Sequence, residues 1–379
     1  MAKIVISSPN QSHLSPQILK YAYPSPHLLL PIASPPNIMT VPVSIVAFQS
    51  ITPAKVTPPG KSRQISVAGN LPPESLSAHF RLILYYRPAA SEDNSAHAVG
   101  AWMKETLSLA LAAEPLFAGR IRRSEAENGG WEVRFNDAGV RLVLAKAAAK
   151  MAEVLDAGDR EEREWGLVYW RDVERDNTDQ SALCYIQVTD FQDSGYCIGI
   201  SCSLLLADPL FLIRFLLKWA HTHSQLTAPS SLATSPIFYL TNFRPSPLPA
   251  HLAAVSTAAP TTSTTLFHLP PTTGNQAGAW PSAGDNFTFL RSDHAGDVKV
   301  ELCVNGGEER GGGDKTARWE ELGAGDLVIG DKNVPVGVSY RIVPGGDGAG
   351  AVIAMVPSDG SDVLVSVTVP VSVSVSAKS

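Results

Sequence analysis

The feature that most constrains this fold is a change of hydrophobic period just after residue 204. Residues 183–191 and 196–204 alternate in the manner of β-strands, and the polar turn between them predicts a hairpin. Asp208 and Pro209 then begin a helix to about Gln225, because Asp is a favoured N-cap and Pro suits the first helical position. Its apolar positions recur at helical spacing, at Leu212, Phe215, Leu216 and Trp219. The strand alternation therefore gives way directly to a helix that is buried along one side.

The flanking sequence continues the mixture of strand and helix patterns. Residues 96–113 carry apolar side chains every four positions and predict a helix that Pro115 ends. Residues 145–180 contain two charged runs and predict a solvated helix and loop. Strand patterns predict strands at 41–51, 80–86, 131–135, 140–144, 287–290, 298–304, 326–329, 337–343, 351–356 and 363–375.

Shifts of composition suggest four parts. Residues 1–42 lack acidic side chains and are rich in Pro and Ser, which predicts a disordered or spurious extension rather than a transit peptide. Residues 43–226 form the first predicted domain. Residues 227–285 are rich in Pro, Ser and Thr and predict a crossover linker, and residues 286–379 form a strand-rich, partial second domain.

Composition excludes some functions. The chain has 379 residues, 44% of them hydrophobic and 17% charged, and its net charge of −6 argues against an electrostatically driven nucleic-acid binder. None of the four cysteines (Cys184, Cys197, Cys202, Cys303) forms a C-x-x-C pair, so buried free thiols are expected. No apolar run reaches the ~18 residues of a membrane-spanning helix. We see no metal-ligand spacing and expect no metal.

Several segments, taken in order, resemble the plant BAHD acyltransferases, which transfer acyl groups from coenzyme A thioesters. Residues 43–61 resemble the family's opening strand and Pro-rich turn, and residues 114–121 resemble its "Y-P-L-A-G-R" signature. Residues 186–201 resemble the strands that lead to its "H-x-x-x-D-G" motif, and residues 357–366 its terminal strand. The resemblance spans residues 43–226 and, more loosely, 326–370.

This resemblance implies an α/β (α+β) fold with mixed sheets and flanking helices, in a two-domain, chloramphenicol-acetyltransferase-like architecture whose second domain is here reduced. Acyl-CoA would be a co-substrate and not a resident cofactor, and a small molecule with a hydroxyl or amine would be the acceptor. In the family, the motif His removes the acceptor's proton, and an imidazole suits this because its pKa lies near working pH. The motif Asp mainly holds the loop in shape.

The chain departs from this motif at two positions. Leu204 stands where the general-base His is expected, and Pro209 stands at the Gly position, whereas Asp208 matches. The second family motif, "D-F-G-W-G", has no counterpart; residues 331–337 are nearest by order. Ser203 is expected to face away from Leu204, and His221 and His223, about 20 Å along the helix, to be solvated. His79 and His268 cannot be placed from the sequence.

The residues leave three hypotheses open. The first is an acyltransferase that obtains its base elsewhere or uses an amine acceptor. The second is a non-catalytic binding or scaffold protein, similar to the eceriferum-type factors that partner fatty-acid elongases in wax synthesis and do not depend on the motif His. The third is a truncated or mispredicted product. We expect a cytoplasmic monomer and leave association with the endoplasmic reticulum open.

Overall fold

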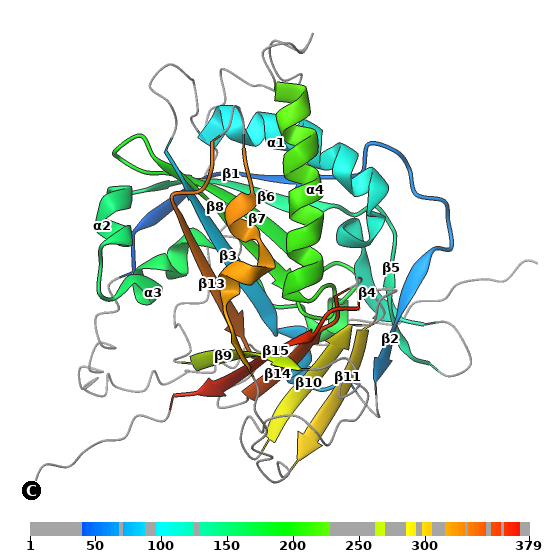
Figure 1. The fold of residues 1–379 in the computed structure, drawn as a ribbon. Helices are drawn as coiled ribbons and strands as arrows, with labels where there is room; N and C mark the ends of the chain where they lie inside the picture. Colours follow the sequence, from blue (N-terminus) through cyan, green and yellow to red (C-terminus); the bar gives the residue numbers. More distant parts are fainter. Residues whose placement is uncertain are drawn as a thin grey trace, which may run out of the picture. The chain divides into compact units, whose positions relative to one another are not determined.

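The computed structural model describes residues 40–67, 71–87, 96–124, 129–227, 262–269, 286–292, 298–304, 315–329, 333–345, 350–357 and 360–371. Residues from 39 onward belong to one unit. The predicted extension 1–42 therefore lies almost wholly outside the described residues, as does most of the predicted linker 227–285. The described elements are mixed α and β, which confirms the predicted fold class (Figure 1).

The hairpin that organises the sequence forms the centre of a mixed sheet, here called sheet A. Six described strands lie in the order β1-β6-β7-β8-β3-β13. Neighbouring strands are antiparallel except β6 and β7, which are parallel. The strands are β1 (Val43–Ile51), β6 (Val140–Ala147), β7 (Cys184–Asp190), β8 (Tyr196–Ser203), β3 (His79–Tyr86) and β13 (Gly337–Val343). The predicted hairpin of β7 and β8 is confirmed.

Two long helices pack on one face of sheet A (Figure 1). They are α1 (Ala96–Ala113) and α4 (Pro209–Thr227), and both agree with the sequence prediction. The predicted apolar positions of both helices are buried in the main core together with β-strand side chains: Val99, Met103, Leu107, Leu111, Leu212, Phe215, Leu216 and Trp219. Burial of these side chains, at roughly 1.5–3 kcal/mol each, holds the helices to the sheet.

Short helices cover the opposite face of sheet A, at the left of Figure 1: α2 (Met151–Leu155), α3 (Arg160–Arg163) and the 3₁₀ helix η3 (Glu164–Leu167). The prediction of a solvated helix and loop at 145–180 is wrong for the part between the charged runs. Residues 165, 167–170 and 173 are buried because the segment returns onto the sheet. Gly199 permits this close approach, since a Cβ there would lie 2.1 Å from the carbonyl oxygen of Leu167.

A second sheet, sheet B, contains nine described strands in the order β12-β9-β15-β14-β10-β11-β2-β5-β4. They are β12 (Lys315–Ala317), β9 (Thr262–Leu269), β15 (Val363–Pro370), β14 (Gly350–Met355), β10 (Asn286–Ser292), β11 (Val298–Val304), β2 (Ser62–Val67), β5 (Trp131–Arg134) and β4 (Arg120–Arg123). β9 lies inside the predicted linker and pairs along its length with β15, so that part of the linker prediction is wrong.

Both sheets draw strands from both predicted domains. β13 follows residue 286 yet pairs with β3 in sheet A, and β2 precedes residue 226 yet runs parallel to β11 in sheet B. Arg120 of β4 is 1% exposed and donates to the carbonyl oxygens of Gly119, Ala138 and Gly139, which ties the start of β4 to the approach to β6. Sheets A and B are thus joined by exchanged strands as well as by packing.

One predicted strand is absent from the described structure. The predicted strand at 326–329 begins with the last residue of the 3₁₀ helix η7 (Ala324–Asp326), which follows η6 (Trp319–Leu322), and it makes only an isolated bridge between Ile329 and Asn333. Leu327 and Ile329 are buried against the main core, and the Leu327 carbonyl accepts a hydrogen bond from the Tyr86 hydroxyl. The apolar pattern therefore reflects burial without strand pairing. The remaining described 3₁₀ helices are η1 (Pro73–Leu76), η2 (Pro115–Ala118) and η4 (Arg175–Asn177).

Two further predictions concern the cysteines and the absence of a membrane-spanning helix. Cys184, Cys197 and Cys202 are free and buried, as predicted, whereas the side chain of Cys303 lies outside the described residues. Among the described helices, none is both long enough and apolar enough to cross a membrane.

Candidate functional site

The motif segment begins where β8 ends and turns directly into α4. Leu204 follows the last residue of β8, and its backbone N–H donates to the carbonyl oxygen of Ala78, 3.1 Å away, which extends the pairing with β3 by one residue. Leu204 is 2% exposed and packs within the main core, together with Leu205, Leu206 and Ala207. The side chain at the general-base position is therefore enclosed by apolar groups.

A buried arginine fixes the turn that follows Leu204. Arg63, on β2 of sheet B, is 8% exposed, and its Nη2 donates to the carbonyl oxygens of Leu205 at 3.0 Å and Leu206 at 2.7 Å. The Ser203 carbonyl accepts from the N–H groups of Leu206 and Ala207 on the other side of the turn. This turn is held by sheet B as well as by sheet A, so its backbone is rigidly placed.

Asp208 caps α4. Its Oδ1 accepts a hydrogen bond of 2.9 Å from the N–H of Phe211, the third residue of the helix, and its carbonyl accepts from Leu212. This satisfies one of the N–H groups that a helix start leaves without a partner. The predicted helix start is confirmed, and the geometry accounts for Asp208 by capping alone.

Ser203 and His79 lie beside Leu204 but on the other face of sheet A. The register pairs His79 with Ser203, and both are at most 3% exposed. His79 donates a hydrogen bond of 2.7 Å from Nδ1–H to the Ser77 carbonyl oxygen and stacks on Trp170, with ring centroids 4.1 Å apart. Burial, together with the nearby charge of Arg81, lowers the pKa of His79 to about 3. An imidazole with so low a pKa is a weak base, and the sheet separates it from Leu204.

The remaining histidines that the sequence raised are distant from the motif. His221 is exposed and contacts Gln225 of its own helix. The prediction that His223 is solvated is wrong: it is 2% exposed, and its Nδ1 lies 3.0 Å from the Thr106 hydroxyl on α1. Its burial lowers the pKa to about 4. Helical spacing alone missed this because the turn that carries His223 packs on α1 rather than facing solvent.

The other side chains that the sequence raised include His268, Cys202 and Asp331. His268, on β9, pairs with Glu321 at 2.7 Å. Burial raises the pKa of the Cys202 thiol well above its usual range, so it stays protonated and unreactive. Asp331, nearest to the second family motif by order, lies outside the described residues. Within the described ranges, no cluster of His, Cys, Asp and Glu could hold a metal ion.

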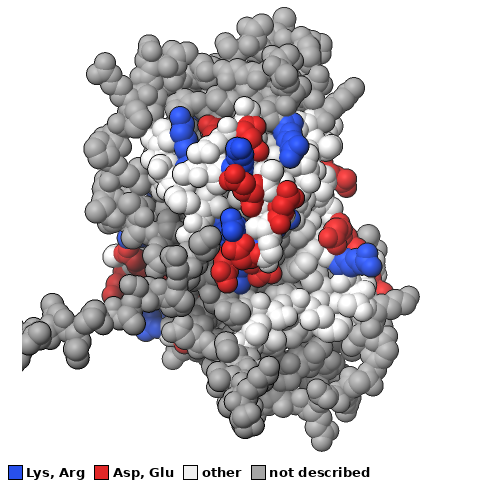
Figure 2. All heavy atoms as spheres, turned by 90° about the vertical axis from the view of Figure 1, so that its left-hand side faces the viewer, with Lys and Arg blue, Asp and Glu red and all other residues white. Residues whose placement is uncertain are grey.

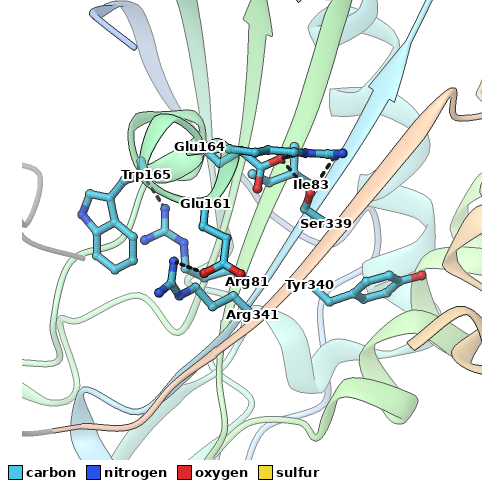
Figure 3. A pocket seen from close by; sticks show the side chains of 9 residues that line it. Arg81, Ile83, Glu161, Glu164, Trp165, Ser339, Tyr340 and Arg341 are labelled. Carbon is cyan, nitrogen blue, oxygen red and sulfur yellow. Dashed lines mark hydrogen bonds and ion pairs between the residues drawn. The ribbon is translucent and has the colours of Figure 1, made fainter. Parts of the chain in front are cut away.

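The sequence reasoning missed a polar cavity of about 230 Å³ on the face of sheet A opposite Leu204. Its walls come from β3, β13 and the α3–η3 segment (Figure 3). The central residues are Arg81, Arg341, Glu164 and Trp165. A signal was present, because Arg81 follows His79 by two positions in an otherwise apolar strand, which places two basic side chains on one face.

Comparison with protein families gives one match that covers more than half of the chain. The family described as "Transferase family" matches residues 41–276. The matched range includes sheet A except β13, both long helices and the whole motif segment.

Two curated relatives, both from Arabidopsis thaliana, match shorter parts of the chain. Protein ECERIFERUM 2 is 30% identical over 173 residues, which are 44% of this chain and 39% of that protein. Protein ECERIFERUM 26-like is 36% identical over 106 residues, or 28% of this chain and 24% of that protein. The chain thus aligns with well under half the length of either relative.

Solved structures give broader but more distant similarity. Vinorine synthase has a TM-score of 0.44 and 17% identity, covering 87% of this chain and 95% of that chain. The F. sporotrichioides protein TRI101, complexed with coenzyme A and T-2, has a TM-score of 0.42 and 12% identity, covering 79% and 93%.

Proposed function

Because this chain belongs to the BAHD acyltransferase family, we propose that it is a member that uses the family fold for binding and does not catalyse acyl transfer. It would act as a non-catalytic binding or scaffold protein. The proposal concerns what the motif segment can do chemically, since family membership alone would favour an acyltransferase.

The observation that carries this proposal is the surroundings of Leu204. A motif base must accept a proton from a bound hydroxyl or amine, and leucine has no group that can do so. Leu204 is 2% exposed and packs in the apolar core, and its three successors are equally buried. His79 is a weak base on the other face of sheet A, and the Asp208 carboxylate caps α4. The described neighbours of Leu204 therefore supply no substitute base.

We propose a protein of fatty-acid elongation in wax synthesis as the partner. The support is that the curated relatives carry the eceriferum name, which agrees with the resemblance to eceriferum-type factors drawn from the sequence. Acyl-CoA remains the small molecule that the family fold would accommodate, bound as a ligand and not turned over. We keep a cytoplasmic location, with contact to a membrane-bound elongase at the endoplasmic reticulum, as part of the same proposal.

A second candidate is a slow acyl-CoA-dependent acyltransferase. Its support is the family match over residues 41–276. General-base catalysis contributes typically about 10²–10⁴-fold, so an acceptor amine that is already unprotonated could attack a thioester without the motif base. This hypothesis requires turnover by the unmodified chain.

The scaffold function is tested by reconstituting a plant fatty-acid elongase in yeast membranes with and without this chain. We expect the chain to shift the acyl products to longer lengths, measured by mass spectrometry of their methyl esters. Leu204→His is the matched variant, and we expect it to keep the shift because the effect does not use a base at that position. An identical product distribution with and without the chain would contradict the proposal.

A further inference from the structure

The face of sheet A opposite Leu204 contains charged groups that neither the fold nor the proposed function explains. Period-two alternation along β3 and β13 puts Arg81, Ile83, Ser339 and Arg341 on this face, and β3 pairs Arg81 directly with Arg341. The α3–η3 segment closes over them and adds the remaining walls of the 230 Å³ cavity. Burying charged groups is costly unless they have partners, so each charge here requires an explanation.

Some N–H donors of Arg81 have no described hydrogen-bond acceptor in this cavity. It is 5% exposed, and its Nη2 donates to the carbonyl oxygens of Trp165 at 2.6 Å and Val168 at 3.0 Å. A guanidinium has five N–H donors, and within the described part of the chain the Nε and Nη1 groups have no hydrogen-bond partner. An almost fully buried cation thus lines a cavity with part of its hydrogen-bonding capacity unused.

Arg341 and Trp165 complete the cationic side of the cavity. The centroid of the Trp165 ring lies 3.9 Å from the guanidinium carbon of Arg81 and 5.7 Å from the guanidinium carbon of Arg341. Arg341 is paired with Glu161 at 3.5 Å (Figure 3), and the Glu161 side chain is 77% exposed, so the acidic side of this pair is open to solvent. Burial and the charge of Arg341 lower the pKa of Arg81 to about 9. A bound anion would relieve this repulsion.

Glu164 does not neutralise Arg81 through a hydrogen bond. Its Oε1 accepts from the Tyr85 hydroxyl at 2.8 Å, from Arg160 at 2.7 Å and from Ser339 at 2.6 Å. These contacts fix Glu164 as the partner of Arg160. The lining side chains comprise three guanidiniums (Arg81, Arg160, Arg341) and two carboxylates (Glu161, Glu164), a net charge of +1. A bound anion of one negative charge would offset this excess among the lining side chains.

We propose that this cavity binds one small organic carboxylate, with its oxygens on Arg81 and Arg341 and its carbon atoms against Trp165 and Ile83. Planar guanidinium groups match carboxylate geometry. A volume of about 230 Å³ lies below the ~300–1,000 Å³ of pockets for drug-sized ligands, which limits the ligand to a short acid. The surrounding face carries acidic and basic side chains intermixed (Figure 2), so recognition depends on the cavity and not on a broad field of one sign.

Binding is tested on the full-length chain by ligand-observed NMR, with sodium butanoate as the probe and butanamide as its neutral counterpart. Inorganic phosphate serves as the multiply charged alternative. We expect butanoate to bind and butanamide not to bind. Absence of butanoate binding, equal binding of the amide, or tighter binding of phosphate would each overturn the proposal.

The site is located with a matched pair of arginines. Arg341→Met should weaken butanoate binding at least tenfold, whereas Arg175→Met, which removes an exposed arginine outside the cavity, should leave it unchanged. If Arg341→Met fails to fold, the site is located on the wild-type chain by protection from chemical modification. Butanoate should slow phenylglyoxal modification of Arg341 but not of Arg175, followed by peptide mass spectrometry. Equal effects on the two arginines would place the carboxylate elsewhere and refute the assignment.

Discussion

At the scale of single residues, Leu204 is a packed core residue at the position where the family resemblance places the general base. Truncating it leaves a cavity in a core whose neighbours are held by hydrogen bonds and cannot collapse easily. We expect Leu204→Ala to lower the free energy of unfolding by about 2–5 kcal/mol in urea denaturation. Val56→Ala is the control, because Val56 is 82% exposed, and it should change stability by less than about 0.5 kcal/mol. Equal effects would mean that Leu204 is not part of the packed core.

Asp208 provides a second residue-scale prediction, because its carboxylate caps α4. Removing the cap in Asp208→Ala should destabilise the chain by about 0.5–2 kcal/mol, whereas Asp208→Asn, which keeps an acceptor oxygen, should cost less. Thermal unfolding of both variants beside wild type measures this difference. If the two substitutions cost the same, capping does not explain Asp208.

The two key motif residues could be placed from sequence, but the polar cavity could not. Strand alternation and cap chemistry are local, so they predicted the face of Leu204 and the helix start at Asp208. Arg81 becomes a candidate ligand-binding residue only when β13 brings Arg341 beside it and Trp165 covers both. These contacts join positions up to 260 residues apart in sequence (341 − 81), and no local pattern encodes them.

At the scale of elements, the packing of α4 on α1 creates a pH-dependent contact. Thr106 on α1 receives a hydrogen bond from Trp219 Nε1 and lies 3.0 Å from Nδ1 of His223. Burial lowers the pKa of His223 to about 4 and, with the charge of Arg81, that of His79 to about 3, from a usual 6.5. Both imidazoles are therefore neutral in the folded chain at pH values where the unfolded chain binds protons.

The consequence is a loss of stability on acidification. Below pH 6.5 the unfolded state takes up a proton at each of these histidines, so the free energy of unfolding falls as pH drops towards about 4. The slope grows as the pH falls through 6.5 and approaches about 1.4 kcal/mol per pH unit for each proton near pH 5. Urea denaturation from pH 7 to 5 should show this slope, reduced in His79→Phe, which keeps a ring on Trp170. An unchanged slope in that variant would show that His79 titrates normally in the fold.

Element prediction succeeded where burial and pairing coincide and failed where they do not. The strands at 298–304 and 337–343 and the helix at 96–113 agree with their sequence patterns. In the segment 326–329, Leu327 and Ile329 are buried in the main core, but the segment has no strand partner beyond an isolated bridge. β9 was missed because its alternation lies within a Ser/Thr-rich region. Its strand conformation is stabilised by pairing with β15.

At the scale of the whole molecule, exchanged strands couple the two sheets. Because β3 depends on β13 for one neighbour and β2 on β11, a fragment ending at residue 227 would leave two strand edges open. We expect fragment 40–227 to be less stable than the full chain by several kcal/mol or to aggregate, judged by circular dichroism and size-exclusion chromatography. A fragment as stable as the full chain would support the independent domain at 43–226, which stays a prediction. Tyr340→Gly, in the full chain, should loosen the same β3–β13 contact.

The central claim is that this BAHD-family protein does not transfer acyl groups through its motif. The direct measurement is release of free coenzyme A and formation of acylated product, with purified wild type, Leu204→His and a protein-free blank, over a panel of acyl-CoA donors with hydroxyl and amine acceptors. We predict wild-type turnover equal to the blank, and any activity confined to Leu204→His. Wild-type turnover above the blank would contradict the claim.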